Sequence, residues 1–123
     1  MADPFRALVI DDDRDLLNLI RRTLEFTAGW EVRTAPSGAA GLELAREAPI
    51  DVIVVDVMMP EMDGYEVCRR LKADTATAGI PIVLLTARRD LDQGRLAGTG
   101  AAGVVFKPFD PGELARQVRG FCA

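Results

Sequence analysis

The residues best suited to chemistry are a run of three aspartates, Asp11–Asp13, and three single residues further along the chain, Asp56, Thr86 and Lys107. Each of them ends or directly follows a short apolar run, as in LVIDDD, DVIVVD, IVLLT and VVFK. If these runs are parallel strands of one sheet, their carboxyl ends meet at one edge. Carboxylates gathered there repel one another and raise each other's pKa, so a hard divalent cation such as Mg²⁺ is the expected occupant.

Each of these residues taken alone has a simpler interpretation. An acidic triplet is typical of a solvated turn, and we interpret Asp13 as the N-cap of the helix that follows. A threonine at a strand end, such as Thr86, is more often a packing or capping residue than a catalytic one. Lys107 precedes Pro108 at the end of a buried strand, which favours a cis peptide bond that would direct the ammonium group inward. The convergence of all these residues on one cleft favours a chemical site over the separate interpretations.

Five short runs predict strands, at 7–10, 30–34, 53–55, 82–85 and 104–106. The second run alternates apolar and polar residues, so we place it at a sheet edge. Amphipathic stretches between the runs predict five helices. The signals that end the first helix and begin the second, third and fifth are Gly29, Ser37, Asp63 and Asp110. Helical spacing of apolar residues predicts their inward faces: Leu16, Leu17, Ile20 and Leu24; Leu42 and Ala45; Val67, Cys68 and Leu71; Leu114, Val118 and Phe121.

The fourth helical segment, near 91–96, has the weakest pattern. Gly94, Gly98 and Gly100 each lower helix propensity by about 1 kcal/mol relative to alanine. We therefore expect a weak and mobile helix there.

This alternation predicts an α/β fold in one domain, residues 1–123: a flavodoxin-like, doubly wound, five-stranded parallel sheet with strand order 2-1-3-4-5 and five helices. The ligand site of such a sheet lies beyond the carboxyl ends of strands 1 and 3, where the winding reverses. The acidic residues fall at this position.

Composition excludes several classes of function. The net charge is −4 and no basic run is present, which argues against direct nucleic-acid binding by this segment. The apolar runs are too short to span a membrane and no signal-peptide pattern opens the chain, so we expect a cytoplasmic protein with no membrane contact. Cys68 and Cys122 form no CxxC pair, which predicts two reduced, unreactive thiols and no zinc site. The chain has no histidine, so it is neither a histidine kinase core nor a histidine phosphotransfer protein.

The motifs LVIDDD, DVIVVDVMMPEMDG, a strand ending in TA, and FKPF occur in the order typical of one family. Across nearly the whole chain the sequence resembles the receiver family of bacterial response regulators. The resemblance implies that Asp56 is the phosphoacceptor and that Thr86 and Lys107 contact the phosphoryl oxygens. It also implies that Asp12 binds Mg²⁺ directly and that Asp11 acts largely through water. Asp56 and the backbone carbonyl of Met58 would be further ligands of the ion. Pro60 and Gly64 would shape the loop after Asp56, with Gly64 serving a backbone conformation.

The resemblance also implies partners. A sensor histidine kinase or a histidine phosphotransfer protein would donate the phosphoryl group. A downstream effector, or an output domain outside this sequence, would respond to it, and dimerisation on activation is left open. The chain would act as a signalling domain whose only catalysis is on itself. One departure concerns Val104, three residues before Lys107, where the family usually has tyrosine or phenylalanine. Phe106 should lie on the strand face opposite Lys107.

Three other functions are compatible with parts of this pattern. A phosphatase of the haloacid dehalogenase type would need a second aspartate two residues after Asp56, where Met58 stands. A flavodoxin-like cofactor binder needs a phosphate loop rich in Ser, Thr and Gly after strand 1, where three carboxylates would repel a phosphate. A degenerate receiver acting only as a protein-interaction module shares the fold, but every site residue is present in this chain.

Overall fold

Strands and helices alternate from one end of the computed structural model to the other, and the structure describes residues 3–122. The strands are β1 (Arg6–Ile10), β2 (Glu31–Ala35), β3 (Val52–Asp56), β4 (Ile82–Ala87) and β5 (Gly103–Lys107). The helices are α1 (Arg14–Ala28), α2 (Gly38–Glu47), α3 (Gly64–Ala73), α4 (Gln93–Ala97) and α5 (Pro111–Gly120), with a 3₁₀ turn, η1 (Arg88–Asp90), between β4 and α4. Each of the five predicted strands is present, and no end differs from the prediction by more than two residues.

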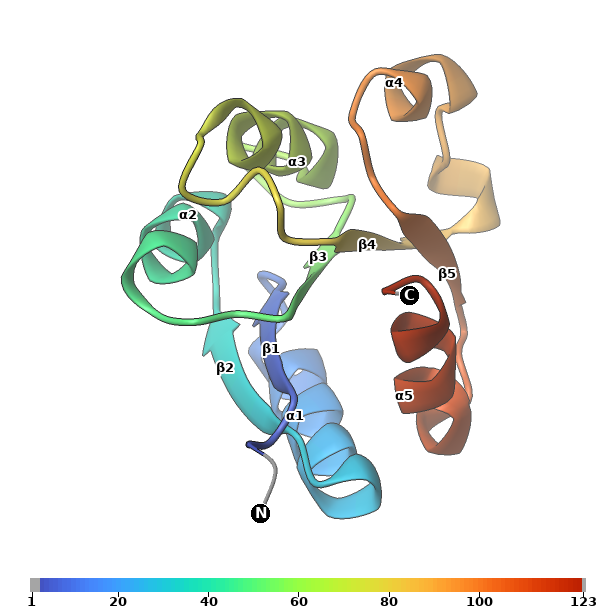
Figure 1. Ribbon diagram of the computed structural model, residues 1–123. Coiled ribbons are helices and arrows are strands. Elements are labelled where there is room, and N and C mark those ends of the chain that lie inside the picture. The colour runs from blue at the N-terminus through green and yellow to red at the C-terminus, as the bar shows by residue number, and fades with distance from the viewer. Residues whose placement is uncertain (1–2, 123) are drawn as a thin grey trace.

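All four strand pairings are parallel, and the order is β2-β1-β3-β4-β5. This confirms the predicted fold class and places the alternating strand β2 at one edge. Helices α1 and α5 cover one face of the sheet, and α2 and α3 cover the other (Figure 1). The central strand β3 is buried along its whole length, which explains why its sequence is an uninterrupted apolar run.

Two apolar layers, one on each face of the sheet, make up the core. Alternate residues of β1 point into opposite layers, as the two-residue repeat of a strand requires. The layer under α1 and α5 includes Val9, Leu17, Ile20, Leu24, Leu114 and Val118. The layer under α2 and α3 includes Ile10, Ala45, Val67, Cys68 and Leu71. The inward faces predicted for α1, α2 and α3 are therefore confirmed.

The helix ends lie where the capping residues predicted them. Asp13 accepts hydrogen bonds from the backbone N–H groups of Asp15 and Leu16, at 3.0 and 3.1 Å. Ser37, Asp63 and Asp110 cap α2, α3 and α5 in the same manner. Gly29 ends α1 with φ of 69°, a conformation that favours glycine.

The fourth helix begins two residues later than the sequence suggested. It has only five residues, none of them buried, and Leu91 and Asp92 lie between the turn η1 and the helix. The prediction for Phe121 was wrong in part. Phe121 lies just past the end of α5 and is 38% exposed, because its ring packs over the backbone at Gly103 instead of continuing the buried face of the helix.

An aromatic pair lies at the edge of the sheet opposite the acidic residues. The ring centres of Phe5 and Trp30 are 4.7 Å apart with the rings tilted by 56°, and the guanidinium of Arg119 lies 3.9 Å from the centre of the Phe5 ring. Trp30 immediately precedes β2, so it lies at the amino ends of the strands. Both cysteines are free, and none of the helices within residues 3–122 has the length and apolar character needed to cross a bilayer.

Candidate functional site

The carboxyl edge of the sheet brings together the residues predicted for the site. Asp11 and Asp12 follow β1, Asp56 ends β3, and Lys107 ends β5. One carboxylate oxygen from each of Asp11, Asp12 and Asp56 lies within 4.8 Å of the other two. Register explains this, because Ile10 pairs with Val55 and thereby sets the two acidic positions level with each other.

Lys107 reaches into this acidic cluster. Its Nζ lies 2.6 Å from Oδ1 of Asp56 and 4.0 Å from Oδ2 of Asp11. The Lys107–Pro108 peptide bond is cis, as expected from the sequence. One ammonium group therefore faces three carboxylates, which leaves an excess of negative charge in the cleft.

Asp11 carries an unsatisfied oxygen. Its Oδ1 accepts a hydrogen bond of 2.9 Å from the N–H of Asp13, but its Oδ2 is buried and has no hydrogen-bond partner among the described residues. A buried carboxylate oxygen without a donor is unfavourable, and a cation would satisfy it. The donor set consists of oxygens only, which suits a hard ion such as Mg²⁺.

Burial and crowding shift the acidity of two of these groups. Desolvation raises the pKa of Asp11 to about 6, and the neighbouring Asp56 adds to the effect, while the N–H of Asp13 and Lys107 oppose it. Desolvation also raises the pKa of Asp56, although its hydrogen bond with Lys107 pulls the pKa back down. Both shifts mean that the apo site resists holding all its negative charge.

Thr86 is buried near the carboxyl end of β4, at the same edge of the sheet. Its hydroxyl donates a hydrogen bond of 3.1 Å to the carbonyl of Ala87, the next residue. In the β4–β5 ladder Thr86 lies directly opposite Phe106. The hydroxyl is thus bonded to a backbone carbonyl of its own strand.

The loop after Asp56 is held against the end of β3. The N–H of Gly64 donates to the carbonyl of Val57 at 2.9 Å, and a Cβ at Gly64 would lie 2.5 Å from the carbonyl oxygen of Asp56. The expectation that Gly64 serves a special backbone conformation was wrong, because its φ is not positive. Glycine is required there for close approach of two backbone segments.

Glu61 is the one non-glycine residue with positive φ, 68°, within the described part of the chain. It is the centre of a γ-turn in which the N–H of Met62 donates to the carbonyl of Pro60 at 2.7 Å. The sequence offered no signal for this conformation, since glutamate is not a residue typical of it. Met58 lies in the same loop and is 60% exposed to solvent.

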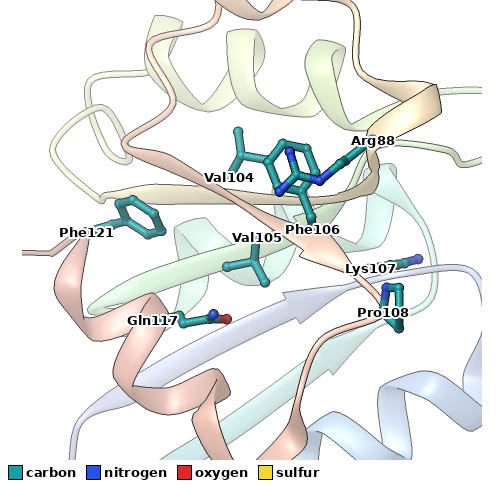
Figure 2. Close-up of a pocket in the computed structure, with 8 residues that line it drawn as sticks. All are labelled: Arg88, Val104, Val105, Phe106, Lys107, Pro108, Gln117 and Phe121. Carbon is teal, nitrogen blue, oxygen red and sulfur yellow. The ribbon is translucent and has the colours of Figure 1, made fainter.

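A pocket of about 440 Å³ adjoins the site on the β5 side. Figure 2 shows Arg88 lying across the ring of Phe106, and its guanidinium carbon is 4.2 Å from the ring centre. Phe106 and Val104 share one face of β5, and Lys107 points away from that face, as predicted. Val104 packs at the margin of the core layer under α2 and α3. A small side chain therefore stands at the position where the resemblance to the receiver family implies a large ring. The Arg88–Phe106 contact was not predicted from sequence.

Comparison with known proteins bears on this site. The family model of the response regulator receiver domain matches residues 7–119, which include all the site residues described above. The chain belongs to this family. It is therefore a receiver domain of the kind found in the response regulators of two-component systems.

Relatives and solved structures agree with the assignment. The chain is 42% identical to the response regulator MprA of a Mycobacterium species over 118 residues, which cover 94% of this chain and 50% of that protein. It is 40% identical to the DNA-binding dual master transcriptional regulator RpaA of a Synechocystis species, covering 93% of this chain and 47% of that protein. The chain thus spans about half the length of these relatives. The chemotaxis protein CheY4 of Vibrio cholerae superposes with a TM-score of 0.89 at 30% identity, covering 97% of this chain and 99% of that chain.

Proposed function

We propose that this receiver domain accepts a phosphoryl group on Asp56 in a Mg²⁺-dependent reaction. A phosphohistidine of a sensor histidine kinase or of a histidine phosphotransfer protein would be the donor. The observation that carries the proposal is the contact of Asp56 with Lys107 at 2.6 Å inside a cluster that also contains Asp11 and Asp12. A structural ion pair alone would not require two further carboxylates or leave Oδ2 of Asp11 without a hydrogen-bond donor among residues 3–122.

The mechanism follows from where charge develops. An oxygen of Asp56 attacks phosphorus, an O–P bond forms, the N–P bond to the donor histidine breaks, and the electron pair returns to the imidazole. Lys107 holds Asp56 ionised beforehand and then pairs with a phosphoryl oxygen. The Thr86 hydroxyl leaves the Ala87 carbonyl and donates to another phosphoryl oxygen. Mg²⁺ held by Asp11, Asp12, Asp56 and the carbonyl of Met58 would neutralise the remaining negative charge.

The modified domain would switch the binding of a partner. The partner is a separate effector or an output domain beyond this sequence, because the relatives are about twice as long and one of them is named as DNA-binding. With a net charge of −4, this domain would make no nucleic-acid contact of its own. We place the protein in the cytoplasm together with its phosphoryl donor. The same site, with water as nucleophile, would remove the phosphoryl group again.

The test is a labelling experiment with acetyl phosphate and Mg²⁺, followed by peptide mapping and mass spectrometry. We expect the label on Asp56 and none in Asp56→Asn. Asp13→Asn is a matched control, because asparagine keeps the helix cap and the substitution removes a nearby carboxylate outside the cluster. Labelling of Asp56→Asn at the wild-type rate would exclude Asp56 as the acceptor.

A further inference from the structure

Helix α4 is attached to the domain mainly by polar contacts. None of its residues Gln93–Ala97 is fully buried, and Leu96 is the one apolar side chain of the helix that packs, partly buried, against a core layer, so hydrophobic packing of the helix itself is limited. Four residues connect it with the start of α3: Asp63, Tyr65, Asp92 and Arg95. We call these four residues the α4 clip, and residues 91–101 the α4 segment.

Arg95 makes the central contacts of the α4 clip. Its Nη1 and Nη2 lie 2.7 and 3.1 Å from Oδ2 and Oδ1 of Asp63, which is a two-pronged guanidinium–carboxylate pair. The same guanidinium lies 4.7 Å from the ring centre of Tyr65. The Tyr65 hydroxyl accepts a hydrogen bond of 2.8 Å from the N–H of Asp92, just before the helix.

The charge state of Asp63 suits this arrangement. Partial burial acts to raise the pKa of Asp63, but the hydrogen bond from Arg95 and the backbone N–H of Glu66 outweigh it and hold the pKa below its usual value. Asp63 is therefore ionised at neutral pH, and the pair with Arg95 is a full ion pair.

The other end of the α4 clip belongs to the phosphoacceptor loop. Asp63 is the N-cap of α3, and the next residue, Gly64, is packed against the backbone of Asp56 and bonded to Val57. A displacement of the loop that begins at Asp56 thus moves the carboxylate that holds Arg95. This connection is separate from the one through Thr86 and β4.

The α4 segment covers apolar surface. Leu96 and Ala101 of the segment pack, beside Val104 of β5, against the buried layer that contains Tyr65 and Cys68. The Cys68 thiol donates a hydrogen bond to the carbonyl of Thr99. Opening of the segment would expose this layer to a partner. The position of the segment would therefore determine whether that surface is available.

We propose that the α4 clip holds the α4 segment closed in the unmodified domain and transmits movement of the Asp56 loop to it. The second half of this statement rests on the proposed phosphorylation of Asp56. The first half does not, so the two can be tested apart.

The first experiment compares amide hydrogen exchange of Arg95→Gln with that of Arg89→Gln. Arg89 is the matched control, because it lies in η1 with an 87% exposed side chain and its one ion pair, with Asp90, is at 4.0 Å. Loss of a half-exposed two-pronged ion pair and of a contact with an aromatic ring should speed exchange in the α4 segment by about tenfold. Asp63→Asn, which retains the helix cap, should give a similar increase. Equal exchange in Arg95→Gln and Arg89→Gln would overturn the proposal.

The second experiment repeats the measurement with Mg²⁺ and beryllofluoride, a phosphoryl mimic. In the wild type the mimic should change exchange in the α4 segment, and this change should be smaller in Arg95→Gln and in Asp63→Asn. A change of undiminished size in both variants would make the α4 clip a passive tether and overturn the transmission. Fluorine NMR of the bound mimic reports separately on the site, so absence of an adduct on Asp56 would count against the proposed function, and the first experiment would still decide the α4 clip.

Discussion

The ammonium nitrogen of Lys107 lies 2.6 Å from Oδ1 of Asp56, and the Asp56 side chain beneath it is only 6% exposed. The pair joins the ends of β3 and β5, which are not neighbours in the sheet. Substitution of Lys107 alone leaves the buried carboxylate of Asp56 without a partner, and this destabilises the fold more than the loss of the attraction itself.

Lys107→Met should therefore destabilise the Mg²⁺-free protein by about 2 kcal/mol at pH 8. The double variant Lys107→Met/Asp56→Asn should recover most of this loss, because the unpaired carboxylate is gone. Urea denaturation of the two single variants and the double variant measures the coupling. Additive losses would mean that the two groups do not depend on each other.

Mg²⁺ at millimolar concentration should raise the melting temperature, because an ion that binds only the native cluster shifts the folding equilibrium. The increase should disappear in Asp12→Ala. The apo form of that variant should equal or exceed the wild type in stability, since one repelling charge has been removed. Differential scanning calorimetry with and without EDTA tests both points. A metal response that persists in Asp12→Ala would move the ion to another site.

The raised pKa of Asp11 predicts a pH dependence with a definite sign. The folded pKa of about 6 lies above the ordinary value of 3.8, so the folded protein binds this proton more tightly than the unfolded chain. The stability contribution is complete below pH 3.8 and is lost as the pH rises through 6. Without Mg²⁺, Asp11→Asn should match the wild type near pH 4 and exceed its stability by about 2–3 kcal/mol at pH 8. Saturating Mg²⁺ should reverse the order at pH 8. A constant difference across this range would contradict the pKa assignment.

Thr86 should carry the phosphoryl signal toward β5 and the α4 segment. Its hydroxyl gains a charged acceptor only in the modified state, and a switch needs such a difference between states. With Mg²⁺ and beryllofluoride, the largest change in hydrogen exchange should fall between residues 86 and 102, and Thr86→Ala should reduce it. The small side chain of Val104 makes a ring rotation at that position unavailable. Changes confined to the Asp56 loop would place the output surface elsewhere.

Substitution by glycine should have opposite effects on stability in the γ-turn at Glu61 and in a helix. Glu61→Gly relieves a φ of 68° that glutamate adopts at a cost, and should leave stability unchanged or raise it by about 0.5 kcal/mol. The same substitution at Glu43, exposed in α2, should lower stability by about 1 kcal/mol. Thermal melts of the two variants make the comparison. Equal losses at both positions would show that the turn at Glu61 carries no strain.

The sequence alone predicted the sheet order, the helix caps and the meeting of Asp11, Asp56 and Lys107, because these depend on strand periodicity, on local hydrogen bonding and on the common edge of parallel strands. It did not predict contacts that depend on side-chain direction between distant segments. Arg88 on Phe106 and Arg95 on Asp63 are of this kind. Gly64 was identified as structural for the wrong reason, since close approach of two backbones leaves no local signature.

The pair formed by Phe5 and Trp30 makes the protein suitable for fluorescence measurements of folding. Trp30 is the only tryptophan, and it lies at the amino ends of strands whose opposite ends hold the acidic cluster, about 15 Å away for five strand residues. Its emission should change when the domain unfolds and its contact with Phe5 is lost, but should be insensitive to a ligand at Asp56. Denaturation followed by tryptophan emission therefore measures stability in the presence of metal or phosphoryl donor without an optical contribution from the site, whereas titration of the site itself requires a different reporter.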